Sequence, residues 1–267
     1  MAERQGIVEK LPDNPTIKLS VFQRAFLRLI GCFFLGHSAD KPIRIGILRW
    51  LVSRGFSPFW YPSADSLQRY WYQMSNQAER SGNRPQFYAN KSQTINFKIL
   101  DIIKKLKIDV PASVFEVGCN AGTNLEFWRN QGVKEFGAIE IGSAALEELN
   151  HSYVELSRNV NIWEGSLEEK LPEIPRSSFD LLFSMAVLEH VHPSSFEVFR
   201  GMSDIACSTI VICEREDVHT MSMVPRNYQY VFERMGWFQV YDETLTEFQD
   251  SMYDNYTIRV FVKTVKP

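Results

Sequence analysis

The residues whose types and spacing suggest chemistry lie in the sequence EVGCNAG, from Glu116 to Gly122. This sequence follows a short apolar run and precedes TNLEFW, which is typical of the start of a helix. Gly118 and Gly122 give a strand-to-helix turn its backbone freedom, and Asn120 between them tolerates left-handed conformations better than most residues. The pattern predicts either a cradle for a ligand or a tight turn that packs a helix closely on a sheet.

Strands and helices alternate around this turn. Apolar and period-2 patterns predict strands at 113–118, 135–141, 160–165, 179–185, 208–214, 238–245 and 256–264. Helical spacing predicts helices at 92–108 (ended by Pro111), 123–132, 143–157 (with Ser143 as N-cap), 194–206 and 227–236. Such alternation indicates βαβ units in a mostly parallel sheet, an α/β fold, and the last two strands should pair antiparallel because no helix separates them.

Polar residues follow the first three of these strands. In an open parallel sheet, ligands bind outside the carboxyl ends of the strands. The second strand ends at Glu140, about 20 residues after the turn, where a carboxylate can accept hydrogen bonds from both ribose hydroxyls. The third strand is followed by Ser166, which with its neighbouring backbone could hold an adenine edge. Together these positions predict a nucleoside site.

The turn does not match the dinucleotide fingerprint. From Gly118 the chain reads GCNAGT, so the second and third glycines of G-x-G-x-x-G are missing. Glu116 is also wrong for a pyrophosphate, whereas it suits a cation or the polar group of an amino acid. A ligand with adenosine at one end and a positively charged methionine moiety at the other fits both observations. That ligand is S-adenosylmethionine.

With these motifs the chain resembles the class I S-adenosylmethionine-dependent methyltransferases, small-molecule type, from roughly Tyr88 to Val265. The likeness rests on VFEVGCNAG for the first motif, GAIEI for the ribose acid, WEGSLEEKLP for the adenine region and SFDLLFSMAVLEHV for the fourth strand. The closing strands, FQVYDE and YTIRVFVK, also match. Asn120 replaces the middle glycine of the usual E/D-x-G-x-G-x-G.

The resemblance implies a Rossmann-like, doubly wound sheet of seven strands in the order 3-2-1-4-5-7-6, with the seventh antiparallel. Gly118 would contact the methionine part, Glu140 the ribose and Leu167 the adenine, while Ser184 or Met185 would line the floor. The residues that it places along the cofactor are Glu116, Gly118, Cys119, Asn120, Gly122, Glu140, Ile141, Ser166, Leu167, Ser184 and Met185.

Candidate catalytic residues follow the fourth strand in the sequence LEHVHP. His190 and His192 could each accept a proton from an acceptor hydroxyl. Alternatively, LEHV only begins the next helix and His190 bonds to the backbone. Some members of the family hold a metal with an E-x-x-E-H run, but Ala186 stands at its first position here, so we expect no metal.

The loop after the fifth strand, CEREDVHT, is a further candidate. Its Glu214, Asp217 and His219 could bind a polar substrate or could form an ordinary charged surface loop.

The acceptor is the least constrained part of the sequence. The chain lacks both the D/N-P-P-Y/F tetrapeptide of amino-methylating nucleic-acid enzymes and the doubled-glutamate loop of protein arginine methyltransferases. We therefore expect a small-molecule acceptor with a hydroxyl nucleophile: a glycan precursor, a lipid-like molecule or a secondary metabolite. One alternative is a catalytically inactive binding or scaffold protein, which the Asn120 departure invites. An NAD-dependent oxidoreductase is disfavoured by the glycine spacing.

Residues 1–87 form a predicted helical and aromatic extension before the methyltransferase domain at 88–267. Within it, Phe22, Phe26, Leu29, Ile30 and Phe33 recur at helical spacing. Residues 18–54 carry seven Lys or Arg and one acid, Asp40. This segment is either a cap, acting as a lid over the substrate, or a surface that contacts a membrane or an acidic or amphiphilic substrate.

Bulk composition limits the partners and the compartment. The net charge of −3 over 267 residues gives no indication of a nucleic-acid partner. The cysteines, Cys32, Cys119, Cys207 and Cys213, form no C-x-x-C pair, which indicates reduced thiols. The N-terminus is polar and lacks the apolar run of a secretory signal, so we expect a cytoplasmic protein, with membrane association through residues 18–54 as a further possibility.

Overall fold

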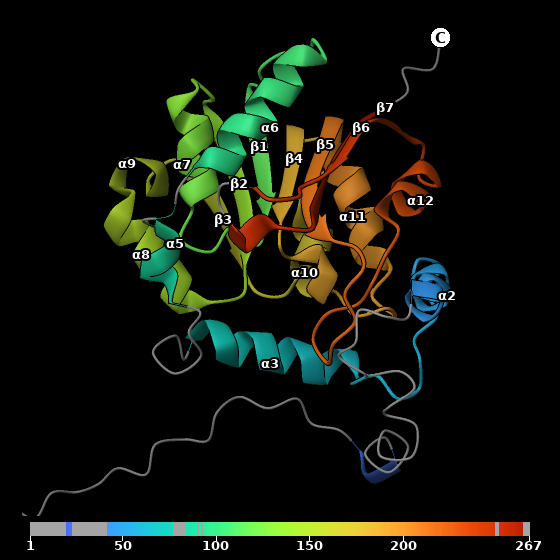
Figure 1. Cartoon of the computed structure of the whole chain (residues 1–267). Helices are drawn as coiled ribbons and strands as arrows, with labels where there is room; N and C mark the ends of the chain where they lie inside the picture. The colour runs from blue at the N-terminus through green and yellow to red at the C-terminus, as the bar shows by residue number, and fades with distance from the viewer. Residues whose placement is uncertain are drawn as a thin grey trace, which may run out of the picture.

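The computed structural model describes residues 20–22, 42–76, 84–89, 91, 93–248 and 251–263. Its centre is a seven-stranded sheet in the order β3-β2-β1-β4-β5-β7-β6, with helices on both faces (Figure 1). The α/β class is the one that the sequence pattern predicts, and the strand order is the one that the family resemblance implies.

The strands are β1 (Ser113–Val117), β2 (Glu135–Glu140), β3 (Val160–Glu164), β4 (Phe179–Met185), β5 (Ala206–Arg215), β6 (Trp237–Thr244) and β7 (Tyr256–Lys263). The first five pair in parallel, and β1 lies between β2 and β4. The predicted antiparallel pairing of the last two strands is confirmed, and β7 also pairs antiparallel with β5. The strand order therefore reverses between β1 and β4, where ligands of such sheets bind.

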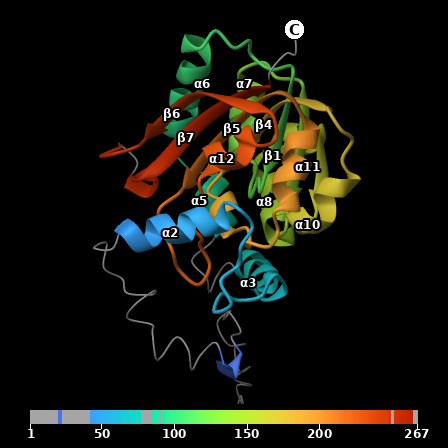
Figure 2. The ribbon, with the colours of Figure 1, turned by 90° about the vertical axis from the view of Figure 1, so that its right-hand side faces the viewer.

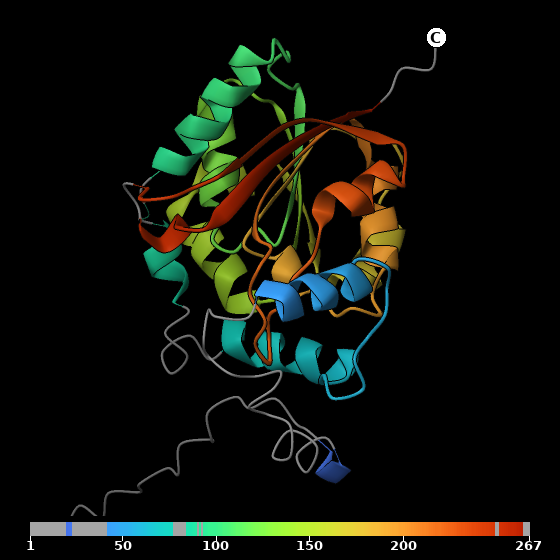
Figure 3. The ribbon, with the colours of Figure 1, turned by 45° about the vertical axis from the view of Figure 1, so that its right-hand side comes forward.

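The helices of the main body are α6 (Thr94–Lys105), α7 (Thr123–Asn130), α8 (Ser143–Ser152), α9 (Val154–Ser157), α10 (Leu167–Lys170), α11 (Glu197–Ile205) and α12 (Tyr228–Glu233). One face of the sheet packs against α6, α7 and α8, and the other packs against α11 and α12 (Figure 3). Successive side chains of a strand point to opposite faces of the sheet, so each strand contributes to both cores. In β4, Leu181 and Phe183 belong to the first core and Leu182 belongs to the second.

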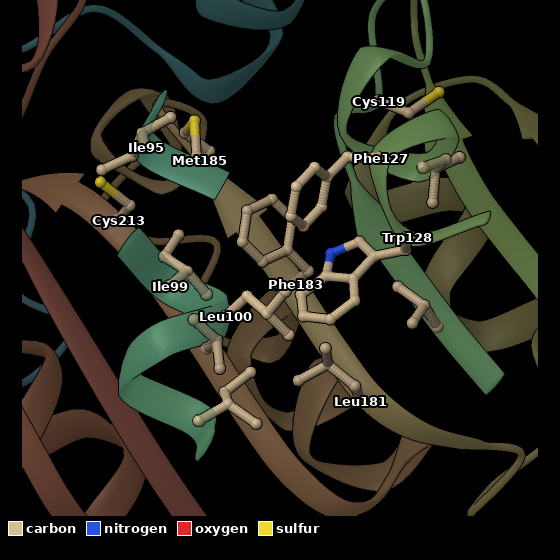
Figure 4. Close-up of a cluster of buried hydrophobic side chains, with 14 of the residues drawn as sticks. Ile95, Ile99, Leu100, Cys119, Phe127, Trp128, Leu181, Phe183, Met185 and Cys213 are labelled. Atoms are coloured by element: carbon tan, nitrogen blue, oxygen red, sulfur yellow. The ribbon is translucent and has the colours of Figure 1, made fainter. Parts of the chain in front are cut away.

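The first core is mostly aliphatic and contains a group of aromatic side chains (Figure 4). The rings of Phe127 and Trp128 from α7 lie edge to face, with centroids 5.6 Å apart, and Phe183 belongs to the same buried cluster. Ile95 and Ile99 of α6 complete this cluster from the opposite side, as their helical spacing predicts.

The largest differences from the predicted helices are in two of them. The helix expected at 143–157 is broken at Tyr153 into α8 and α9, and Ser143 is its first helical residue, with Gly142 at the N-cap position. The helix that contains Ile95 ends at Lys105, before Lys107 adopts a left-handed φ of 56°. Pro111 therefore does not end it. Beyond Phe22, the predicted amphipathic helix around residues 21–36 lies outside the described residues.

Two further helices, α2 (Pro42–Val52) and α3 (Ala64–Asn76), lie at the carboxyl edge of the sheet (Figures 1 and 2). They share a small hydrophobic cluster of Leu48, Val52, Tyr61, Leu67 and Val224. A short helix, α5 (Pro85–Ala89), follows α3. Within the described ranges, no helix has the length and apolarity needed to cross a bilayer.

Polar contacts join these N-terminal helices to the main body. Asn76 Oδ1 at the end of α3 accepts hydrogen bonds from Ser143 Oγ at 2.7 Å and from the Ala144 amide at 3.3 Å. Glu216 pairs with Arg49 of α2 and with Arg259 of β7. The N-terminal helices are thereby held against the loops that end the strands.

The glycine at position 122 generates a testable prediction. Gly122 has φ +80°, and a Cβ added there would lie 2.7 Å from Leu149 Cδ1. We expect Gly122→Ala to lower the free energy of unfolding by about 2–4 kcal/mol, because left-handed strain and overpacking add. Urea unfolding measures the loss.

The control is Gly132→Ala, where φ is +97° and a Cβ would meet no atom within 4 Å. In that variant the free energy of unfolding should fall only by the cost of a left-handed backbone at a non-glycine residue, about 1–2 kcal/mol. Equal losses in the two variants would contradict the packing argument.

Candidate active site

A cavity of about 540 Å³ opens at the carboxyl ends of β1, β2, β3 and β4. Its volume falls within the range of about 300–1,000 Å³ that is usual for small-molecule sites. One wall is α3, which contributes Leu67, Gln68, Trp71, Met74 and Ser75. Ten predicted site residues line it: Gly118, Cys119, Asn120, Glu140, Ile141, Ser166, Leu167, Met185, His190 and His192.

The turn after β1 has the backbone that the sequence predicts. Asn120 has φ 47° and Gly118 has φ 70°, both in the left-handed region. The Asn120 side chain stabilises this conformation, since its Oδ1 accepts a hydrogen bond from the Ala121 amide at 2.8 Å. A Cβ at position 118 would lie 2.5 Å from Val187, so Gly118 allows close packing against the β4 loop as well as access to the cavity.

Gly122 does not line the cavity. It lies against Leu149 of α8 and allows α7 to pack closely, which is the alternative role considered for this glycine.

Glu140 at the end of β2 is the acid that the sequence predicts for the ribose. The carboxylate accepts the Asn120 amide on Oε2 and the Gly142 amide on Oε1, each at 2.8 Å. Burial raises the pKa of this carboxyl, and the amide bonds oppose that rise. Each oxygen keeps a second lone pair for a ligand, so the side chain can fix the turn and accept two hydroxyls at once.

Glu116 lies behind the turn, nearly fully buried and outside the cavity lining. Its Oε1 accepts a hydrogen bond from Asn124 Nδ2 at 2.6 Å, and Asn124 itself lines the cavity. Oε2 is buried and makes no hydrogen bond within the described part of the chain. Burial raises the pKa of Glu116 to about 8, and an unsatisfied carboxyl of this kind is a favourable place for a nearby cation or N–H donor.

The loop after β3 also reaches the cavity. Ser166 is the N-cap of α10, and its Oγ accepts the Glu169 amide at 3.3 Å in a capping box. Leu167 follows it on the cavity wall, and Ile141 lines the wall after β2.

Ser184 has a different position from the predicted one. It is fully buried, and its Oγ donates to Glu214 Oε1 at 2.7 Å instead of lining the cavity, whereas Met185 does line it. Glu214 Oε2 accepts the amides of Val187 and Leu188, each at 3.0 Å. Glu214 is therefore a buried residue that orders the β4 loop, and neither of the predicted roles for it is correct.

The other two candidates of that loop also lie outside the cavity lining. Asp217 is exposed and pairs with Arg215, and the ring of His219 stacks on Tyr61 at 6.0 Å.

His190 lines the cavity, and one of its ring nitrogens is hydrogen-bonded to the backbone. Its Nδ1 lies 2.7 Å from the Ser222 carbonyl oxygen, which can only accept, so Nδ1 carries the proton and Nε2 keeps its lone pair. Nε2 is 3.7 Å from Glu189 Oε1, and the ring packs on Trp71 with centroids 4.1 Å apart. Burial lowers the pKa of His190 to about 4, so the imidazole is neutral near pH 7.

His192 has both ring nitrogens engaged. Nε2 donates to the Pro62 carbonyl at 2.8 Å, and Nδ1 accepts the Ser194 amide at 3.1 Å. This geometry argues against the predicted proton-accepting role and assigns His192 to joining the segment before α3 to the β4 loop.

Sequence reasoning did not single out several aromatic residues of the cavity. Trp71, Tyr88, Tyr253 and Tyr256 line it beside Lys91, whose Nζ lies 4.1 Å from the centre of the Tyr253 ring. Only the richness in Tyr and Trp between residues 60 and 90 hinted at the first two, because this lining comes from segments far apart in the chain.

A family model described as a methyltransferase domain matches residues 114–206. The match covers β1 to the start of β5, and so the turn, Glu140 and both histidines. Residues 114–206 are therefore a methyltransferase domain, and the sheet around them has the strand order of the class I S-adenosylmethionine-dependent methyltransferases. S-adenosylmethionine is accordingly the methyl donor of this domain. No curated protein sequence matches the chain.

Similar solved structures show the same fold at low sequence identity. The methyltransferase domain of bacterial CtHen1-C is 13% identical, with a TM-score of 0.50 over 65% of this chain and 98% of that one. The PH0226 protein from Pyrococcus horikoshii OT3 is 12% identical, with a TM-score of 0.50 over 66% and 92%. The [4+2]-cyclase SpnF is 14% identical, with a TM-score of 0.51 over 63% and 81%.

The residues present fit this methyl donor. Glu140 offers free lone pairs at the cavity wall, Gly118 opens the turn, and Glu116 has an unsatisfied oxygen behind it. Among the described residues, no group of three or more His, Cys, Asp or Glu could hold a metal ion.

The buried carboxyl of Glu116 predicts a dependence of stability on pH. Its folded pKa of about 8 exceeds the unfolded value of 4.5, so the folded state holds an extra proton between these pH values. This contribution to stability is present at low pH and is lost as pH rises through about 8. Between pH 6.5 and 8 the slope should be on the order of 1 kcal/mol per pH unit.

Glu116→Gln should lack this slope, because the amide does not titrate. Urea unfolding of both proteins at pH 6.5 and pH 8 measures the difference between them. Parallel pH profiles would show that Glu116 is already ionised in the folded protein.

Proposed function

We propose that this methyltransferase transfers a methyl group to a hydroxyl of a small molecule that carries an apolar, planar or lipid-like portion. The observation that carries the proposal is His190, a neutral imidazole with an available Nε2 at the wall of an aromatic-lined cavity. A glycan precursor, a lipid-like intermediate or a secondary metabolite would each meet this description.

The cofactor would be held by the ends of the first three strands. Glu140 would accept the ribose hydroxyls, and Ser166, Leu167 and Ile141 would surround the adenine. Asn124 and Glu116 would receive the amino-acid part, because the carboxyl behind the turn lacks a partner for Oε2. When bound, S-adenosylmethionine supplies an electrophilic methyl group.

The acceptor would occupy the remaining part of the cavity, next to Met185 and His190. Trp71, Tyr88, Tyr253 and Tyr256 offer flat apolar surface and hydroxyl groups there, and Lys91 offers a cation. This lining supports an acceptor that combines an apolar body with a polar or acidic group. Of the N-terminal extension, α3 lines the cavity and would act as a lid that excludes water from it.

His190 would take the proton of the acceptor hydroxyl as the oxygen–methyl bond forms. The Ser222 carbonyl fixes the tautomer, which keeps the Nε2 lone pair free for that proton. Glu189 Oε1, 3.7 Å from Nε2, would stabilise the imidazolium that results.

Two other observations bear on the function. The similarity to a [4+2]-cyclase means that the fold alone does not define a reaction, so the proposal rests on the site. The left-handed φ of Asn120 removes the reason for expecting an inactive scaffold, since this residue adopts the backbone that the family's glycine provides. Free thiols at Cys119, Cys207 and Cys213 support a reducing compartment such as the cytoplasm.

Replacing Glu140 tests the cofactor site. Glu140→Ala should weaken S-adenosylmethionine binding by about 10- to 100-fold, because hydrogen bonds to a charged acceptor contribute about 1.5–3 kcal/mol. It should also lower the melting temperature, since the Asn120 and Gly142 amides lose their acceptor. Isothermal titration measures the affinity.

Glu164→Ala is the control. Glu164 pairs with Glu140 in the strand register but is exposed and lies outside the cavity lining. If Glu140→Ala bound S-adenosylmethionine with wild-type affinity, Glu140 would not be the residue that holds the ribose.

Replacing His190 tests the proton acceptor. Once an acceptor hydroxyl compound is found by screening, His190→Gln should lower kcat by about 10²- to 10⁴-fold at unchanged cofactor affinity. In the wild type, protonation of His190 itself should limit activity only as pH approaches about 4.

His192→Gln is the matched control, with a lower melting temperature and a far smaller change in kcat, because its nitrogens bond to Pro62 and Ser194. A larger kcat loss in His192→Gln than in His190→Gln would contradict the assignment.

A further inference from the structure

The α2 surface exposes large apolar side chains that the methyltransferase site does not use. We give this name to Phe22, Ile47, Trp50, Phe56 and Phe59, each more than half exposed. The rings of Phe22 and Phe59 lie 6.1 Å apart, which joins the short piece at residues 20–22 to the turn that follows α2. The four side chains other than Phe22 lie within residues 47–59, and such a concentration of exposed apolar side chains indicates a binding surface.

The two faces of α2 have different surroundings. Leu48 and Val52, four residues apart, are buried in the small cluster shared with α3. Ile47 and Trp50, three residues apart, lie on the opposite face and are exposed. The guanidinium of Arg54 lies 4.1 Å from the centre of the Trp50 ring, so a positive charge accompanies the exposed aromatic.

The charge of this segment indicates which partner would cover it. The residues between Asp40 and Asp65 include Lys41, Arg44, Arg49 and Arg54 and no Asp or Glu, and of these four cations Arg49 pairs with Glu216. A second copy of the chain would bring the same basic segment against itself, because a twofold interface pairs identical surfaces. Like charges would then face one another, whereas an anionic lipid surface would complement them.

We propose that the α2 surface docks on a membrane that contains anionic lipids. Its aromatic side chains would enter the headgroup region while Arg54 reaches the phosphates, which is the arrangement of interfacial amphipathic segments. Tyr61 and Leu67 belong to the same cluster as α2, and Leu67 lines the cavity. Docking would therefore bring the α3 wall of the cavity close to the lipid.

This position gives an amphiphilic acceptor a direct route from the bilayer to the cavity. Only this last step rests on the proposed function, since docking itself does not depend on the acceptor.

The test is co-sedimentation with vesicles of phosphatidylcholine alone and of phosphatidylcholine with phosphatidylserine. The full chain should bind the anionic vesicles, and binding should weaken as salt is raised. The variant Ile47→Ser/Trp50→Ser/Phe56→Ser should bind these vesicles about tenfold more weakly, because apolar burial is lost. The control Phe238→Ser/Val240→Ser, with exposed residues of β6, should bind like the wild type.

Three outcomes would overturn the proposal: no binding to either vesicle, equal binding by the α2 variant and the wild type, or an oligomer that dissociates in the α2 variant, since a second copy would then cover the surface. If the triple variant does not fold, Trp50→Ser alone serves the same comparison. Titration with S-adenosylmethionine keeps the two proposals distinguishable, because the α2 variant should retain wild-type cofactor affinity whether or not the membrane proposal holds.

Discussion

Two buried carboxyl groups accept hydrogen bonds from backbone N–H groups of the loops that form the candidate active site. Glu140 at the end of β2 accepts the amides of Asn120 and Gly142, and it thereby links the β2 end to the turn after β1. Glu214 in β5 accepts the amides of Val187 and Leu188 and the hydroxyl of Ser184, and it links β5 to the loop after β4. These loops flank the β1–β4 boundary where the strand order reverses. Buried amides without such acceptors would be costly, so the cavity and its supporting loops form together.

The sequence was sufficient for the fold and for one side of the site. Strand–helix alternation predicted the α/β sheet and its antiparallel last pair, and the family resemblance implied the strand order. The departure at Asn120 was correctly interpreted as a permissive backbone position. Residues close to strand ends, such as Glu140 and Leu167, could be placed because the ends of parallel strands converge. Gly122 and Ser184 were assigned to the cavity but face helix α8 and Glu214, since motif spacing gives the position along the chain and does not give the side-chain direction. The aromatic wall could not be predicted, because its residues come from segments brought together only by tertiary packing.

The histidines show how neighbouring residues with similar patterns acquire different roles. One ring nitrogen of His190 is hydrogen-bonded to the Ser222 carbonyl and the other is available to a ligand. Both ring nitrogens of His192 are hydrogen-bonded, one to Pro62 and one to Ser194. The β4 loop thus carries the candidate proton acceptor and, two residues later, an attachment for the segment that leads to α3. Trp71 of α3 then packs on His190. The α3 wall proposed to cover the acceptor and the group proposed to take its proton are therefore positioned by the same loop.

The most direct measurement of the central claim is a crystal structure with S-adenosylhomocysteine, the demethylated cofactor. The ribose hydroxyls should lie on Glu140, the adenine beside Leu167, and the sulfur should face the part of the cavity lined by Met185 and His190. A ligand bound elsewhere, or one whose ribose does not contact Glu140, would contradict the arrangement described here.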